Sequence, residues 1–163
     1  MRTFARNFLL MSLTCRIANS QDDFRQAITK VYEASFSAMR QIKTKAELQQ
    51  MVDAIDVPEW QANLPSGEIM TRSEAITSLT GLLAVPTENR PVPHQQMLYM
   101  TETGWSAFAV YWIYRRVGDT LVGSLARDTW ARTPQGWRRI RHEKLFPDRP
   151  LVENGKGLIL PTP

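Results

Sequence analysis

Residues 126–143 read ARDTWARTPQGWRRIRHE, and this stretch predicts a tight β-hairpin. Proline sets the backbone angle for the second position of a type I turn, and glycine supplies a left-handed residue after it. Pro134-Gln135-Gly136 is therefore expected to form a three-residue loop with a bulge at the glycine. Strands rich in aromatic and β-branched residues are expected on both sides of this loop.

The loop length decides which side chains lie opposite one another. A three-residue loop pairs Trp130 with Ile140 and Asp128 with His142. Directly opposed side chains have β-carbons about 5 Å apart, so this acid and this histidine could share a hydrogen bond. A two-residue loop would shift the pairing by one residue and place Arg127 opposite His142. The three-residue loop is preferred because it gives Gly136 a role.

The same hairpin closes a longer antiparallel meander. Strands are expected at residues 95–102, 105–116, 120–132 and 137–145, separated by short turns. With Gly118-Asp119 as a type II′ turn, one face of this sheet carries small residues surrounded by two aromatic residues, an acid and a histidine. That composition is typical of a pocket wall, mostly apolar with a few convergent polar groups. The face consists of Ala107, Ala109, Tyr111, Ala126, Asp128, Trp130, Ile140 and His142.

Three helices are expected before the meander. Apolar residues recur at three- and four-residue steps from Asp22 to Ile42. Thr44 and Thr71 each stand three residues before a glutamate, which is the spacing of a capping box at a helix start. Pro58 limits the second helix. Helices followed by a meander indicate an α+β fold, in which the helices cover one sheet face.

The opposite face of the predicted sheet is aromatic at one end and cationic at the other. It includes Phe108, Val110, Trp112, Tyr114, Leu121, Leu125, Arg127, Thr129, Arg139 and Arg141. If the helices cover the first face, this second face stays exposed unless another subunit packs on it. A homodimer through the sheet face is therefore expected. The pattern alone leaves open which face the helices cover.

The N-terminal residues 1–20 resemble an export signal. Arg2 and Arg6 precede a short apolar run at residues 8–15, and Ala18-Asn19-Ser20 offers a small-x-small cleavage site. This pattern predicts a periplasmic or secreted protein; the alternative is an N-terminal helix of a cytoplasmic protein. The apolar run is too short to span a bilayer. One α+β domain is then expected over residues 21–146, with a Pro/Gly-rich tail at 147–163.

Composition excludes several function classes. The net charge is +4, but residues 1–20 hold three arginines and no acid; the remaining 17 basic and 16 acidic residues leave +1. A nearly neutral body does not predict nucleic-acid binding. Two histidines and the single Cys15 cannot build a structural zinc site. No glycine-rich phosphate loop or dinucleotide motif occurs, so no metal and no cofactor is expected.

These elements together resemble the nuclear transport factor 2-like superfamily, nearest its bacterial SnoaL-like and related exported members of unassigned function. The resemblance rests on the capped helices, the Asp128-x-Trp130-x-Arg132 stretch, the Gly136-Trp137-Arg138-Arg139-Ile140-x-His142 strand and Asn154-Gly155-Lys156. It covers residues 22–143. It implies a cone-shaped α+β barrel of three helices on a strongly bent antiparallel sheet, a deep pocket between them, and dimerisation through the sheet. Members include isomerases, dehydratases, cyclases and proteins that only bind or dimerise.

Each candidate site residue has two interpretations. Asp128 and His142 are an acid-base pair, with Tyr111 polarising a substrate oxygen, or they are a hydrogen-bonded pair that closes the core. The remaining candidates line the expected pocket or fill the core and its turns: Tyr32, Asp56, Ala107, Ala109, Trp130 and Ile140. Asp56 lies near the position where steroid isomerases of the resembled superfamily keep their base.

No catalytic set of the resembled enzymes is complete in this chain. The sequence therefore predicts a module that binds a small, largely apolar molecule or takes part in assembly. The alternative is a pocket enzyme, an isomerase, dehydratase or cyclase, that uses Asp128 and His142 to move protons.

Overall fold

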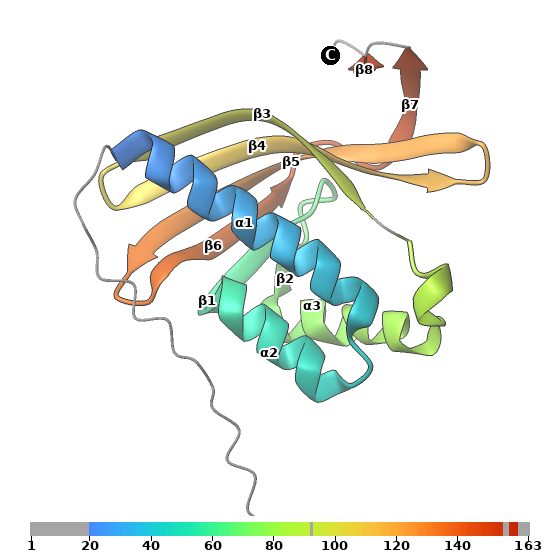
Figure 1. Cartoon of the computed structure of the whole chain (residues 1–163), viewed down its shortest axis with the longest axis horizontal. Coiled ribbons are helices and arrows are strands. Elements are labelled where there is room, and N and C mark those ends of the chain that lie inside the picture. The colour runs from blue at the N-terminus through green and yellow to red at the C-terminus, as the bar shows by residue number, and fades with distance from the viewer. Residues whose placement is uncertain (1–19, 92, 155–156, 160–163) are drawn as a thin grey trace, which may run out of the picture.

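The computed structural model describes residues 20–91, 93–154 and 157–159. In this part of the chain, three helices lie on one side of a bent, open sheet (Figure 1). The predicted α+β class is confirmed. Apart from Ser20, the predicted export signal lies outside the described residues, and so does most of the Asn154-Gly155-Lys156 segment.

The helices are α1 (Ser20–Gln41), α2 (Lys45–Ile55) and α3 (Arg72–Leu79). Both predicted capping boxes are confirmed. The Thr44 hydroxyl accepts from the Glu47 N–H at 3.2 Å, and the Glu47 carboxylate accepts from the Thr44 N–H at 3.1 Å. Thr71 and Glu74 repeat the arrangement at the start of α3. Two short 3-10 turns follow, η1 (Thr80–Ala84) and η2 (Thr87–Asn89).

A buried arginine closes the C-terminal end of α1. The Arg90 guanidinium donates to the carbonyls of Met39 and Ile42 at that end, and to the Val85 carbonyl in the loop after η1. The last carbonyls of a helix have no hydrogen-bond donor within the helix. Here the Arg90 side chain alone supplies donors to two carbonyls at this end. The loop between the helices and the sheet is thus tied to α1.

The main sheet has the order β2-β1-β6-β5-β4-β3. Its predicted antiparallel meander is confirmed as β3 (His94–Thr103), β4 (Ser106–Val117), β5 (Thr120–Thr133) and β6 (Gly136–Lys144). Two strands continue it, β1 (Asp56–Asn63) and β2 (Ile69–Thr71). In the described residues the two ends of this path, β2 and β3, do not pair, so the sheet is open.

The expectation of a wholly antiparallel sheet is wrong at β1. This strand runs parallel to β6, with Ala62 opposite His142 and Asn63 opposite Glu143. Polar and apolar residues do alternate from Glu59 to Asn63, and Trp60 and Ala62 are buried, but the run is short and follows Pro58, so the sequence alone predicts no strand here. The position of β1 follows from α2, because α2 ends at Ile55 and the next residue, Asp56, lies beside β6.

The β5–β6 turn is shorter than expected. Thr133 pairs with Gly136, so the loop holds only two residues, although Gly136 has the expected positive φ of 102°. Trp130 consequently pairs with Arg139, and the predicted pairing of Trp130 with Ile140 is wrong. A bulge then absorbs Ile140, because Thr129 pairs with Arg141. Beyond the bulge Asp128 faces His142, as predicted.

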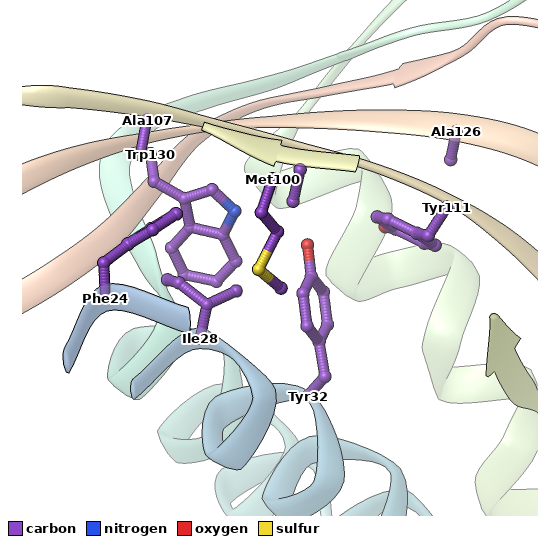
Figure 2. Close-up of a cluster of buried hydrophobic side chains, with 9 residues drawn as sticks. Phe24, Ile28, Tyr32, Met100, Ala107, Tyr111, Ala126 and Trp130 are labelled. Carbon is purple, nitrogen blue, oxygen red and sulfur yellow. The ribbon is translucent and has the colours of Figure 1, made fainter. Parts of the chain in front are cut away.

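The helices cover the face that carries Asp128 and His142, which we call the inner face. Figure 2 shows Phe24, Ile28 and Tyr32 rising from α1 toward the sheet, where the Trp130 indole packs against them. Ala107 and Ala109 are fully buried beneath this layer. These small residues admit the side chains of α1, so the expectation that they leave an empty pocket is wrong at this end.

The opposite, outer face is partly covered by the chain after β6. Strand β7 (Arg149–Asn154) pairs with β5 and lies on the side away from the helices, and β8 (Gly157–Ile159) pairs with β7 (Figure 1). Leu151 packs on Trp112, and the Arg149 guanidinium lies 5.2 Å from the Trp112 ring centroid. The rest of this face forms an open hollow of about 500 Å³. Its lining residues are Glu59, Gln61, Phe108, Arg127, Thr129, Ile140, Arg141 and Glu143.

Candidate functional site

Asp128 is the centre of a buried hydrogen-bond network on the inner face. Its side chain is fully buried. Its Oδ2 accepts from the Tyr32 hydroxyl at 2.6 Å, the Tyr111 hydroxyl at 2.9 Å and Nη1 of Arg139 at 3.3 Å. Its Oδ1 lies 2.7 Å from Nδ1 of His142. Helix α1 and strands β4, β5 and β6 therefore meet at one carboxylate.

Arg139 extends this network to a second carboxylate. Its Nε lies 2.7 Å from Oδ1 of Asp56, and its Nη2 lies 3.1 Å from Oδ2, which is a two-point ion pair. The Trp60 ring lies under the guanidinium, 5.4 Å from centroid to Cζ. The neighbouring Arg138 donates to the Asp53 and Ala54 carbonyls at the end of α2. Two consecutive arginines thus fasten the α2–β1 junction to β6.

The charges in the network follow from burial and these contacts. Burial by itself would raise the pKa of Asp128, but Arg139, His142 and Tyr32 outweigh it and lower that pKa to about 2. Burial raises the pKa of Asp56, and Arg139 opposes this rise. Burial and the Asp128 charge raise the pKa of the Tyr32 and Tyr111 hydroxyls. Asp128 is therefore ionised at neutral pH, and both tyrosines remain protonated donors.

A cavity of about 180 Å³, which we call the inner cavity, opens beside this network between the helices and the sheet. Its polar wall consists of Tyr32, Asp56, Tyr111, Arg139 and His142. Its other walls are mostly apolar side chains from all three helices and the sheet. They are Ser35, Phe36, Met39, Met51, Val52, Ile55, Trp60, Ala75, Leu79 and Ile113.

Four of the predicted site residues meet at the inner cavity. Tyr32, Asp56, Tyr111 and His142 line it, while Asp128 lies behind them, in contact with both tyrosines and the histidine. This part of the predicted constellation is brought together by the fold.

The other predicted pocket residues lie elsewhere. Ala107, Ala109 and Trp130 are fully buried in the core against α1. Ile140 lines the outer hollow, because the bulge turns it to the opposite face.

Arg139 is the site residue that sequence reasoning missed. Simple alternation from the expected three-residue loop places it on the outer face, and the two-residue turn brings it inside. The only available signal was the cationic end of the predicted face opposite Asp128, which includes Arg139 and Arg141. A buried acid such as Asp56 or Asp128 needs a cation, and this requirement could have directed attention to Arg139.

Comparison with solved structures identifies the fold. No family model matches the chain, and no curated protein matches its sequence. Solved structures do match. A conserved protein from Planctomyces limnophilus has a TM-score of 0.61 at 14% identity, over 80% of this chain and 99% of its own. A nuclear transport factor 2-like protein with a cystatin-like fold, from Novosphingobium aromaticivorans, has a TM-score of 0.57 at 16% identity, over 83% and 86%.

A third match is a nuclear transport factor 2-like protein of unknown function from Shewanella oneidensis, with a TM-score of 0.59 at 7% identity, over 73% of this chain and 96% of its own. The chain has the nuclear transport factor 2-like fold. At these identities the similarity concerns the fold alone, and proteins that share a fold host many unrelated activities.

The polar wall defines what the inner cavity can do chemically. When His142 is neutral, its Nδ1–H donates to Asp128, which leaves the Nε2 lone pair free. Arg139 and the tyrosine hydroxyls supply the other polar atoms of the wall. Among the described residues, no group of three or more His, Cys, Asp or Glu side chains is arranged to hold a metal ion. No helix in the described segments has the length and apolar character needed to cross a membrane.

Proposed function

We propose that this protein binds a small, largely apolar molecule in the inner cavity, with one polar group of that molecule at the Arg139–His142 wall. The observation that carries this proposal is the cavity itself, about 180 Å³ of space between apolar helix side chains and an ionised network. An apolar cavity of about 150 Å³ in another protein holds a benzene molecule. A ligand of similar size fits here.

The network supports a preformed site. Asp128 accepts from four groups, and Arg139 holds Asp56 at two points. Ordered polar groups around a mostly apolar space are typical of small-molecule sites. Because these contacts hold the side chains of the wall in place, binding requires little rearrangement, which favours affinity.

Toluene is a direct probe of this proposal. We expect it to shift the NMR methyl signals of Val52 and Ile55, which line the cavity. Ala75→Leu, also at the lining, should fill the space and abolish these shifts. Ala46→Leu, at an exposed position of α2, is the matched control and should leave them unchanged. Toluene shifts that persist in Ala75→Leu, or that are missing in the unmodified protein, would refute binding in the inner cavity.

A proton-transfer enzyme is the second candidate, and the Asp128–His142 pair favours it. A carboxylate on Nδ1 orients the imidazole and fixes the tautomer with a lone pair on Nε2, so His142 can act as a general base. Arg139 can then stabilise negative charge that develops on a ligand oxygen. Deuterium uptake from D₂O at the α-carbon of cyclohexanone tests this candidate. Uptake that depends on His142 supports it, and uptake equal to the buffer rate refutes it.

We also propose that two copies of this chain associate through the outer face. Phe108 and Ile140 are only half-buried beside the outer hollow, and the Arg127–Glu143 ion pair lies in the same lining. A second sheet packed there would cover these apolar groups. Sedimentation of the protein and of Phe108→Glu tests the proposal: a dimer that the charge dissociates supports it, and a monomer in both samples refutes it.

Export remains a proposal for the segment before α1. It rests on Arg2, Arg6, the apolar run at residues 8–15 and the small residues at 18–20. Expression of the full chain in a bacterium, followed by N-terminal sequencing of the periplasmic fraction, tests it. A mature chain that begins at Gln21 is the expected result.

A further inference from the structure

We propose that the ligand of the inner cavity is a single six-membered ring that carries one hydroxyl group. This proposal rests on the function proposed above and narrows it to a ligand class. The ring follows from the volume: about 180 Å³ holds one ring with a small substituent. The hydroxyl follows from which polar atoms of the wall a ligand can reach.

The two carboxylates of the network offer almost no surface to a ligand. Asp128 has no exposed surface, and the side chain of Asp56 is only 4% exposed. A ligand ammonium group therefore has no accessible carboxylate to pair with. By contrast, the side chains of His142 and Arg139 are 23% and 20% exposed, and both line the cavity.

His142 and Arg139 offer one acceptor and one set of donors at neighbouring positions. They bind the two oxygens of the same Asp128 carboxylate, so their side chains lie next to each other. With Nδ1–H directed to Asp128, His142 presents Nε2 as an acceptor. Arg139 commits three of its five N–H bonds to Asp56 and Asp128. A hydroxyl group can donate to Nε2 and accept from a remaining Arg139 N–H, which satisfies both.

Other ligand groups fit less well. A ketone accepts from Arg139 but leaves Nε2 without a donor, and a hydrogen bond left unmade when the ligand displaces water costs free energy. A methyl group satisfies neither side chain. A carboxylate meets a cluster of two carboxylates and one guanidinium, whose net charge is negative while His142 is neutral, and is repelled.

Phenol and toluene make a matched test, because a hydroxyl replaces a methyl group of similar size. Water solvates phenol better, so transfer into an apolar cavity favours toluene unless the wall bonds to the hydroxyl. We expect calorimetry to give phenol a Kd at least tenfold below that of toluene. Benzoate and benzylamine, which add a negative and a positive charge, should both bind more weakly than phenol.

His142→Asn identifies the acceptor. The asparagine amide can take the place of Nδ1–H against Asp128, but it has no atom at the position of Nε2. This variant should lose the tenfold preference for phenol over toluene. His94→Asn is the control, since the chain's other histidine is exposed on β3, where it stacks on Tyr114. It should retain the preference.

The outcomes separate the two proposals. If neither toluene nor phenol binds, both proposals are refuted: binding in the inner cavity and a hydroxyl-bearing ring as its ligand. If toluene binds but phenol is no tighter, or benzoate or benzylamine is tighter than phenol, the hydroxyl assignment is overturned while the cavity remains a binding site. A phenol preference that survives His142→Asn also overturns the assignment.

Discussion

Nδ1 of His142 lies 2.7 Å from Oδ1 of Asp128, although the turn between them is one residue too short for this pairing. The bulge at Ile140 supplies the missing residue. Between the turn and the bulge the register brings Arg139 to the inner face, and beyond the bulge it brings His142 there. A single irregularity in β6 therefore gives Asp128 both a cation and an imidazole.

Replacing Arg139 should be strongly destabilising. Arg139→Met leaves Asp56 and Asp128 buried without their common counter-charge, and breaking a buried ion pair from one side costs about 3–5 kcal/mol. Urea denaturation measures the loss. Arg141→Met, two residues along on the outer face, should change the free energy of unfolding by no more than about 0.5 kcal/mol. Equal effects in the two variants would contradict the buried network.

The tyrosine hydroxyls should stabilise the Asp128 carboxylate. Tyr32→Phe removes a 2.6 Å hydrogen bond to a charged group and should cost about 1.5–3 kcal/mol of unfolding free energy. It should also raise the pKa of Asp128, which NMR of the labelled carboxyl carbon measures. Tyr99→Phe removes a hydroxyl from a side chain that is 56% exposed and should do neither. If the pKa of Asp128 is unchanged in Tyr32→Phe, the Tyr32 hydroxyl does not donate to the Asp128 carboxylate.

Stability should fall in acid because of Asp128. Its folded-state pKa of about 2 lies below the unfolded value of about 3.9. Its contribution to the free energy of unfolding is therefore complete above the unfolded pKa and disappears as the pH falls toward 2. The loss is on the order of 2 kcal/mol. Asp56, whose folded pKa is raised, acts in the opposite direction, since its protonation favours the folded state.

Unfolding free energies measured from pH 6 to pH 2 check this account. The slope should flatten in Asp128→Asn. In Asp56→Asn it should steepen, because the opposing contribution is removed. A slope in Asp128→Asn as steep as in the unmodified protein would show that other groups control acid unfolding.

Two glycines should respond differently to alanine. A β-carbon at Gly123 would lie 2.7 Å from the Ile113 carbonyl oxygen in β4 and 2.8 Å from the Leu151 side chain, so Gly123→Ala pushes β5 away from β4 and displaces Leu151. We expect a loss of about 1–3 kcal/mol. Gly81, in η1, has open space around it, and Gly81→Ala should be neutral or stabilise by up to about 1 kcal/mol. Thermal unfolding of both variants measures the difference.

Much of the fold could be predicted because local signals agree with it. Thr44 and Thr71 begin helices as their capping boxes indicate, and the Gly118 turn fixes the β4–β5 register, with Ala109 opposite Asp128. By contrast, β1 pairs with a strand about eighty residues further along the chain, and no local pattern encodes a parallel partner at that separation.

The site could be predicted only in part. The proximity of Asp128 and His142 followed from the hairpin, but two errors cancelled: the loop is shorter than expected, and a bulge restores the pairing. Local turn preferences do not specify a bulge that tertiary packing selects. The inner position of Arg139 depends on the two-residue turn and on its ion pair with the buried Asp56, so it became evident only in three dimensions.

A crystal structure of the protein under xenon pressure tests whether the inner cavity exists, because xenon enters apolar cavities without any specific bond. We expect xenon in the inner cavity, in contact with Met51, Ile55 and Ala75, with the Asp128–His142 contact unchanged. A cavity filled by rearranged side chains, with no xenon between the helices and the sheet, would contradict this expectation.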